Sequence, residues 1–364
     1  MRLTIKRYDV MKKINFCAGP SILPQLVLEQ LSEAILDYQG TGLSLLEISH
    51  RSTLFDEIRY GAQALVKELL GIGDDYAVLF LTGGASMQFS QVPYNLLSST
   101  DTAAYLDTGR WAQKAIKEAQ LFGNVAIIGS SADRGYRYLP TISPLNTEQY
   151  RYLHITTNNT VCGTQLSSIP DVSCPIVADM SSDIFSKPID GNKFGLIYAG
   201  AQKNSGTAGT TLVIVRKDLL KKVDRLIPTM LNYQTHIDKL FNTPPVFAIY
   251  ASYLTLKWVK AQGLSTIAAN NNKKASMLYK EIDRNSLFEG FADKAARSIM
   301  NATFVLKDPT LSSTFLSMAE SAGCVALKGH VSLGGFRASM YNAMPSQAVH
   351  ILIDIMQTFE RKFS

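Results

Sequence analysis

The fold class of this chain is indicated most clearly by the alternation of short apolar runs with longer amphipathic stretches between about residues 60 and 225. Apolar runs of strand length occur at 77–81, 102–106, 125–128, 152–156, 175–178, 196–198 and 210–215. An amphipathic stretch at 111–121 has the length and periodicity of a helix. Strands that alternate with helices of this kind predict βαβ units and a mostly parallel sheet, covered on both faces.

The character of the chain changes after about residue 265. Helical periodicity at 254–260 and 275–282 is followed by apparent strands at 298–306 and 335–340 and a closing helix at 346–359. We expect a large α/β domain of residues 25–265 and a small α+β domain formed by residues 1–24 with 266–364. Residues 1–10 precede a second Met and are interpreted as an upstream-start extension or a weakly ordered arm.

Composition narrows the class of protein. Of 364 residues, 46% are hydrophobic and 18% charged, which excludes a disordered chain or a small disulfide scaffold. The net charge of +6 allows nucleic acid, a membrane surface or small anions as partners. No apolar stretch nears about 18 residues, the sequence predicts no signal peptide, and four scattered cysteines suit a reducing compartment. We expect a cytoplasmic protein without a membrane segment or a metal site.

Three local features of the sequence indicate a chemical function. Lys203 lies among small residues in YAGAQKNSGTAG (198–209), where desolvation lowers the pKa of an amine and makes it a nucleophile toward carbonyls. Asp179 ends the apolar run 175–179, at the edge where parallel sheets place functional groups. The segment TGGAS (82–86) follows a strand and opens a helix, whose N-terminus favours a phosphate.

Each feature also has a plainer interpretation: a lysine in a Gly-rich turn, a helix N-cap on residues 181–182, and an ordinary strand–helix turn. In combination and in this order they predict a pyridoxal phosphate enzyme. The cofactor phosphate would lie at the helix N-terminus, Asp179 would hold the ring nitrogen, and Lys203 would form a Schiff base with the aldehyde.

Nine segments distributed from about residue 14 to the C-terminus carry a family resemblance. They are NFCAGP (15–20), EISHRS (47–52), TGGAS (82–86), DTGRWA (107–112), NTVCG (159–163), ADMSS (178–182), YAGAQKN (198–204), FNTPP (241–245) and GHVSLGGFRASMYNAMP (329–345). Together they resemble the phosphoserine aminotransferases, which belong to the class V aminotransferases and to fold-type I pyridoxal phosphate enzymes. The resemblance implies a mostly parallel seven-stranded sheet in the large domain.

The resemblance also implies roles at the cofactor. Lys203 would form the Schiff base and later shuttle a proton, Asp179 would hold the pyridinium proton, Trp111 would stack on the ring, and Thr160 would bond its hydroxyl. Homodimers with shared active sites are implied as well. The cofactor phosphate would be bound by Ala85, Ser86 and Gln202 together with Asn242 and Thr243 of the other subunit.

For the substrate, the resemblance implies that Arg337 binds the α-carboxylate as a bidentate fork. His50 and Arg51 from the other subunit would receive the distal phosphate or γ-carboxylate together with His330. The implied reaction exchanges 3-phosphohydroxypyruvate and glutamate for O-phosphoserine and 2-oxoglutarate in serine biosynthesis, with a related step in vitamin B6 synthesis.

Two departures from the family pattern weaken the substrate assignment. Val331 stands where the family has an arginine that contacts the distal anion, and Arg110 is a candidate replacement. The segment 236–241 is two residues shorter than usual, which affects the placement of Asn242 and Thr243. One rival is therefore an aminotransferase for a less anionic 2-oxo acid.

The rival from another class is a basic nucleotide- or nucleic-acid-binding protein. Its strongest support is the basic run RKDLLKKVDR at 216–225, which we interpret as the solvated face of an amphipathic helix. Because no aromatic residues are interleaved with these cations, we expect small anions and no nucleic acid as partners.

Overall fold

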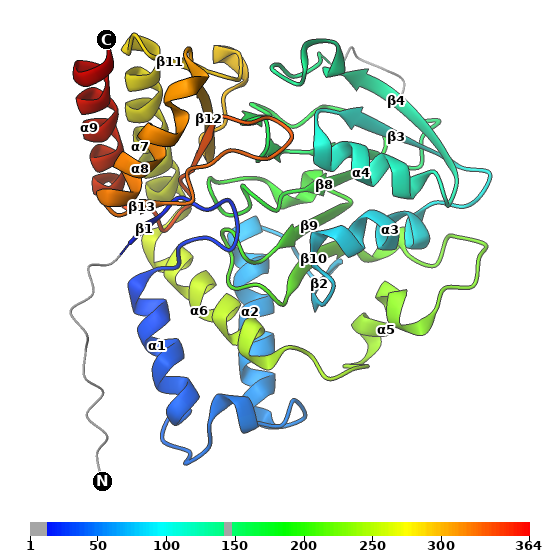
Figure 1. The fold of residues 1–364 in the computed structure, drawn as a ribbon. Helices are drawn as coiled ribbons and strands as arrows, with labels where there is room; N and C mark the ends of the chain where they lie inside the picture. Colours follow the sequence, from blue (N-terminus) through cyan, green and yellow to red (C-terminus); the bar gives the residue numbers. More distant parts are fainter. Residues whose placement is uncertain (1–12, 142–147) are drawn as a thin grey trace.

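A seven-stranded sheet forms the centre of the larger part of the molecule (Figure 1). The computed structural model describes residues 13–141 and 148–364, so the interpretation of residues 1–10 lies outside the described chain. The strands follow the order β2 (Tyr76–Leu81), β10 (Thr211–Arg216), β9 (Leu196–Gly200), β8 (Ile176–Asp179), β5 (Leu153–Thr156), β3 (Thr102–Asp107) and β4 (Asn124–Ser130). Only β10 runs antiparallel to its neighbours, so the predicted mostly parallel sheet is confirmed.

Helices cover both faces of this sheet (Figure 1). One face packs against α3 (Gly84–Leu96) and α4 (Arg110–Ala119), the other against α2 (Thr53–Leu70) and α6 (Val246–Gln262). Alternate residues of one strand belong to opposite cores: in β2, Leu79 faces α3 and Val78 faces α2. Burial on both faces explains why the strands other than the edge strand β4 form largely apolar runs.

Further elements surround the sheet. The helix α1 (Gln25–Leu36) packs on α6, α5 (Tyr233–Asp238) follows the loop after β10, and β6 (Asn158–Asn159) pairs with β7 (Thr164–Gln165). Short 3-10 helices lie at Leu45–Glu47, Ala132–Arg134, Gly191–Lys193, Lys217–Leu219, Thr229–Leu231, Lys294–Ala296 and Pro309–Leu311. No helix in the described ranges is both long enough and apolar enough to cross a bilayer.

A second, smaller core lies at the C-terminal end of the chain. Its elements are an antiparallel sheet of β11 (Phe288–Gly290), β12 (Asn301–Leu306) and β14 (Phe336–Ser339), and the helices α7 (Leu264–Arg284), α8 (Ser312–Ser321) and α9 (Ser346–Phe363). The N-terminal β1 (Ile14–Asn15) pairs in parallel with β13 (Cys324–Val325), and Phe16 is buried in the same core. The segment Ile14–Phe16 therefore packs with the C-terminal elements.

One continuous helix, α7, takes part in both cores. Ile267 in its first turn packs against the large sheet, whereas Leu278 and Ile282 pack in the small core. Between them the Asn271 amide donates to the Ser186 carbonyl, and the Lys274 ammonium donates to the Tyr341 carbonyl at 2.8 Å. The chain therefore passes from one core to the other within a helix and not through a loose linker.

The prediction of a helix at residues 216–225 is wrong. Arg216 ends β10, a 3-10 turn follows at Lys217–Leu219, and Lys221 has a φ of 60°. The Arg225 guanidinium donates to the carbonyls of Leu97 and Phe122, both at 2.6 Å. Tertiary contacts of the leucines and of Arg225 override the local helical pattern, and the run presents no continuous basic face.

Candidate active site

Lys203 lies in the turn that joins β9 to β10, at one end of the large sheet. Two distant segments hold this turn: the Ser21 hydroxyl donates to the Lys203 carbonyl, and the Asn342 N–H donates to Asn204 Oδ1 at 3.0 Å. The side chain is half-buried. Burial lowers the pKa of the Lys203 ammonium to about 8, although the charge of Asp179 opposes the shift.

Asp179 is the last residue of β8, as predicted, and is 6% exposed. The Ser181 N–H donates to its Oδ1 at 2.9 Å, but no helix begins there, so the contact closes a local turn. Burial raises the pKa of the carboxyl group, and the charge of Lys203 lowers it. The two functional groups that the sequence predicted are therefore electrostatically coupled.

Two functional side chains behind Asp179 were missed by sequence reasoning. Tyr198 faces Asp179 in register across β9 and β8 and shares a hydrogen bond with its carboxylate. The Tyr198 hydroxyl is also 2.9 Å from His154 Nε2. The His154 ring stacks on Tyr105, with centroids 4.8 Å apart, and burial lowers the pKa of the imidazole to about 3.

The protons of this group can be assigned from the contacts. When Tyr198 donates its proton to Asp179, its oxygen accepts from His154 Nε2–H, which leaves Nδ1 of the neutral ring without a proton. Nδ1 is buried and has no partner among the described residues, which agrees with this tautomer. Because side chains alternate between the two faces of a strand, the sequence could have predicted that these residues lie on one face of the sheet. The order of the strands, which makes these residues neighbours, cannot be predicted from the sequence.

A second chain of contacts joins α4 to β14. Trp111 Nε1 donates to Thr160 Oγ1 at 2.9 Å, and Arg337 Nη1 donates to the Thr160 carbonyl at 3.1 Å. Arg337 is half-buried, and its Nε is a buried donor without a partner within the described chain. Three residues predicted separately are therefore brought together, and the guanidinium retains an unused donor.

The expected phosphate-binding turn begins α3. Gly83 has a φ of 97° and precedes the helix, so Ala85 and Ser86 lie in its first turn. The first N–H groups of a helix have no acceptor within the helix, so this turn can receive an anion. Gln202, next to Lys203, is half-buried with its amide folded over Gly200, where an added Cβ would lie 2.7 Å from Gln202 Oε1.

Four predicted residues are not joined to this group by hydrogen bonds or ion pairs within the described chain. His50 and Arg51 lie between the 3-10 turn Leu45–Glu47 and α2, and their side chains form no hydrogen bond or ion pair in the described structure. Asn242 and Thr243 follow α5, which occupies part of the segment expected to be a loop. The Asn242 amide donates to the Thr243 carbonyl.

His330 lies in the loop between β13 and β14, which extends toward the large sheet (Figure 1). Its Nδ1 accepts from the Ser332 N–H at 3.1 Å, so Nε2 carries the proton. Burial lowers the pKa of the imidazole, and the positive charges of Arg110, Arg337 and Lys114 lower it further. Val331, the next residue, is 97% exposed.

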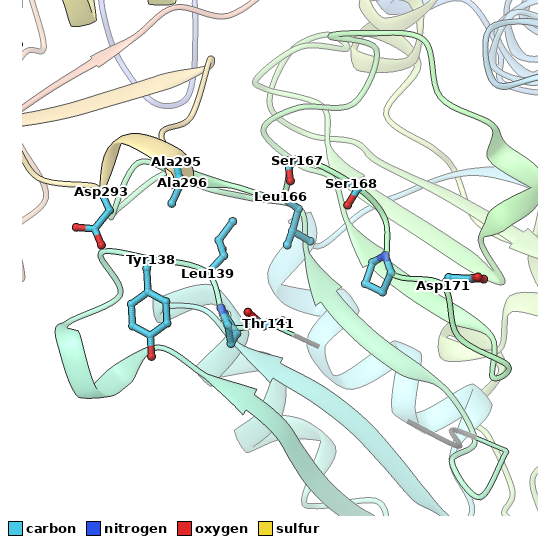
Figure 2. Close-up of a pocket in the computed structure, with 12 residues that line it drawn as sticks. Tyr138, Leu139, Thr141, Leu166, Ser167, Ser168, Asp171, Asp293, Ala295 and Ala296 are labelled. Carbon is cyan, nitrogen blue, oxygen red and sulfur yellow. The ribbon is translucent and has the colours of Figure 1, made fainter. Parts of the chain in front are cut away.

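A large cavity elsewhere does not compete with this site. It has a volume of about 620 Å³ and is lined by residues 138–141, 166–168, 170–171, 293 and 295–296 (Figure 2). None of the predicted site residues lines it, and its described lining includes Asp171 and Asp293 but no cation. An anionic substrate would find no counter-charge there.

The residues around Lys203 fit pyridoxal phosphate. An amine with a lowered pKa, a buried carboxylate at a neighbouring strand end, an indole and a helix N-terminus match the aldehyde, ring nitrogen, ring face and phosphate. The unpaired Nε of Arg337 adds a buried donor for a further anionic group.

Comparison with known proteins agrees with this chemistry. The sequence pattern of the class V aminotransferases matches residues 14–352. The chain belongs to this family. It is 53% identical to the phosphoserine aminotransferase of Flavobacterium psychrophilum, over 97% of this chain and 100% of that protein.

Solved structures extend the comparison to the fold and the cofactor. The phosphoserine aminotransferase from Bacillus circulans subsp. alkalophilus has a TM-score of 0.93 and 44% identity, over 97% of this chain and 99% of that one. The pyridoxal phosphate-bound phosphoserine aminotransferase from Trichomonas vaginalis has a TM-score of 0.88 and 34% identity, over 95% of this chain and 100% of that one. The protein is therefore a pyridoxal phosphate-dependent transaminase of fold type I.

Proposed function

We propose that this transaminase exchanges glutamate and 3-phosphohydroxypyruvate for 2-oxoglutarate and O-phosphoserine in serine biosynthesis. The observation that carries the proposal is the convergence of Lys203 and Asp179 with the cationic group around Arg337. The chain is similar to phosphoserine aminotransferases over nearly its whole length. The proposed substrates are based on this similarity.

When bound, pyridoxal phosphate supplies an aldehyde that carries the amino group and a ring that withdraws electrons from the substrate α-carbon. Lys203 would act first as the nucleophile that holds the cofactor and then, through Nζ, carry a proton from the substrate α-carbon to the cofactor carbon that bears the amino group. A pKa of about 8 suits both tasks, because the neutral amine is populated near neutral pH.

Asp179 provides a negative charge beside the ring nitrogen, which stabilises a proton there. Donation from the Ser181 N–H and from Tyr198 lowers the pKa of the buried carboxyl group and so opposes the rise that burial causes. Trp111 presents a flat apolar face that excludes water, and Thr160 holds the indole in place.

Two anion subsites complete the proposed site. Arg337 binds the α-carboxylate common to all four substrates, and His330 belongs to the distal subsite that receives either a phosphate or a γ-carboxylate. One pocket can then serve both half-reactions, which predicts ping-pong kinetics. A related phosphorylated 2-oxo acid of vitamin B6 synthesis has the same pair of anions.

The proposal includes a cytoplasmic homodimer with shared sites. His50 and Arg51 of one subunit would complete the distal subsite of the other, and Asn242 and Thr243 would complete its phosphate site. Within the described residues, none of the four bonds to the Lys203 group of its own chain, which supports this assignment. We also assign residues 25–265 to a large domain and residues 1–24 with 266–364 to a small one, which the two separate cores support.

Val331 favours a second candidate, a transaminase for a less anionic 2-oxo acid. It is apolar and 97% exposed, so it adds no charge to the distal subsite. Losing one charge-assisted pair with a phosphate costs about 1.5–3 kcal/mol, or roughly ten- to a hundred-fold in affinity. The rival function in nucleic-acid binding has no comparable support, since residues 216–225 form no basic helix.

Steady-state rates with purified enzyme test the substrate. We expect the highest kcat/KM with 3-phosphohydroxypyruvate and glutamate, compared with hydroxypyruvate and glyoxylate as acceptors and alanine as donor. A hundred-fold preference for a non-phosphorylated acceptor would contradict the proposal and favour the second candidate. An absorbance spectrum of the same preparation checks independently that the cofactor is bound through Lys203.

A further inference from the structure

Two cations at the start of α4 lie beside the substrate site. Arg110 is the first residue of the helix, and the Nζ of Lys114 lies 5.0 Å from the centre of the Trp111 ring. Trp111 in turn bonds Thr160, whose carbonyl accepts from Arg337. Gly109 approaches the opposite segment so closely that a Cβ there would lie 3.1 Å from Asn159 Oδ1. The first turn of α4 is thus held against the segment that binds Arg337.

This group of cations has no counter-charge in the described structure. Arg110, Lys114 and Arg337 take part in none of the ion pairs formed by the described residues. The nearest carboxylates along the chain are engaged elsewhere: Asp107 is buried and accepts from Tyr136, and Glu118 accepts from Ser90 at 2.7 Å. Converging like charges without a partner favour the binding of an anion between them.

His330 adds a neutral donor to the same group. Its Nδ1 accepts from the Ser332 N–H, so the protonated Nε2 is free to donate. The loop is held by the Leu333 and Gly334 N–H groups, which donate to the His330 carbonyl at 2.9 and 2.8 Å. The charges of Arg110, Lys114 and Arg337 all act on this imidazole, in agreement with the contacts that link α4 through Thr160 to Arg337.

We propose that Arg110 determines specificity by binding the distal phosphate of a phosphorylated substrate, a task in which Val331 takes no part. The inference rests on the proposed function and names the cation that makes it possible. A phosphate monoester carries nearly two negative charges at neutral pH and a carboxylate carries one. Removing Arg110 therefore weakens recognition of the phospho-acid more than that of 2-oxoglutarate.

Arg110→Ala and a matched control, Lys117→Ala, separate this role from a general charge effect. Lys117 is exposed on the same helix, carries the same charge and is not among the cations that act on His330. In the holoenzyme, Arg110→Ala should raise the KM for 3-phosphohydroxypyruvate about ten- to a hundred-fold. Its KM for 2-oxoglutarate should rise less, and Lys117→Ala should change neither more than about twofold. Equal effects of the two variants would overturn the proposal.

A compensating variant tests position as well as charge. Arg110→Ala combined with Val331→Arg restores a guanidinium at the residue next to His330 in the chain. We expect the double variant to regain at least about a third of the lost kcat/KM for the phospho-acid. No recovery, in a variant whose melting temperature is unchanged, would show that the effect of Arg110→Ala arose from the helix and not from the anion subsite.

A binding measurement keeps this inference distinct from the proposed function. In holoenzyme with labelled histidines, assigned with His330→Gln, the NMR titration of His330 should shift to higher pH in Arg110→Ala but not in Lys117→Ala. Inorganic phosphate should perturb the same signal and bind more weakly to Arg110→Ala. If these results hold while the enzyme does not use 3-phosphohydroxypyruvate, the proposed function fails alone. If turnover occurs and Arg110→Ala changes neither signal nor KM, the present inference fails alone.

Discussion

The two ends of the candidate site differ in burial and in the secondary structure that provides their residues. The cofactor end consists of buried strand residues: Asp179 is 6% exposed, His154 2% and Tyr198 0%. The distal end consists of an exposed helix start with Arg110 and a loop whose tip residue, Val331, is 97% exposed. The first end is tied together by hydrogen bonds, whereas the second is a group of cations without a counter-charge among the described residues.

This difference follows from what each end has to do. A carboxylate that must stay ionised in a low-dielectric interior needs fixed donors, and only neighbouring strands hold such donors at constant distance. A group that selects among substrates can lie on exposed segments, because an arginine keeps its charge there. The distal end can therefore exchange one cation for another without disturbing the sheet.

Lys203→Ala should have the largest effect, because it removes both the nucleophile and the proton carrier. We expect turnover to fall at least about a thousand-fold while the melting temperature stays within a few degrees of the parent. Steady-state assays and thermal unfolding measure the two quantities. Activity above a tenth of the parent value would exclude Lys203 as the reacting amine.

Tyr198→Phe should weaken the cofactor end without changing its shape. The variant loses the donor to Asp179 and the acceptor for His154, so the pKa of Asp179 rises further. We expect the dissociation constant of pyridoxal phosphate, measured by equilibrium absorbance, to rise about ten- to a hundred-fold. Tyr152→Phe is the matched control, because the Tyr152 hydroxyl bonds only that of Tyr105, at 2.9 Å, among the described residues. Equal losses in both variants would contradict a specific role for Tyr198.

The rate of cofactor capture by cofactor-free protein should depend on pH through Lys203. Its pKa is lowered to about 8, so the reactive neutral amine is lost as the pH falls below that value. Stopped-flow absorbance should show a rate that rises about tenfold from pH 6 to 7 and levels above about pH 8. A rate still rising above pH 10 would indicate an unperturbed lysine. In Asp179→Asn the plateau should begin at lower pH, since the aspartate charge holds the pKa of the amine up.

Val331→Arg in the otherwise unchanged chain should have the smallest effect. The position is almost fully exposed, so a new cation there is screened by solvent. We expect the KM for 3-phosphohydroxypyruvate to fall by at most about fivefold, because Arg110 already serves the subsite. A gain of a hundred-fold would mean that the distal end of this chain lacks an effective cation.

Much of this arrangement was predictable from local sequence. The apolar runs predicted all seven strands of the large sheet to within about two residues at each end. Six of these strands are largely buried and therefore apolar, whereas the edge strand β4 is partly exposed. Asp179 at a strand end and Lys203 in the following turn were predicted from their neighbours. The run at 216–225 was mispredicted as a helix, because its leucines and Arg225 are held by distant parts of the chain.

The amino-acid sequence alone indicates the α/β alternation, a lysine among small residues, the strand-end carboxylate and the helix that begins at 84. These depend on residues close together in the chain. The contacts of the folded chain are needed to see that Tyr198 and His154 support Asp179, that β1 pairs with β13, and that the first turn of α4 is linked through Thr160 to Arg337. The order of strands and the docking of loops depend on packing between segments tens to hundreds of residues apart. Local periodicity does not predict that packing.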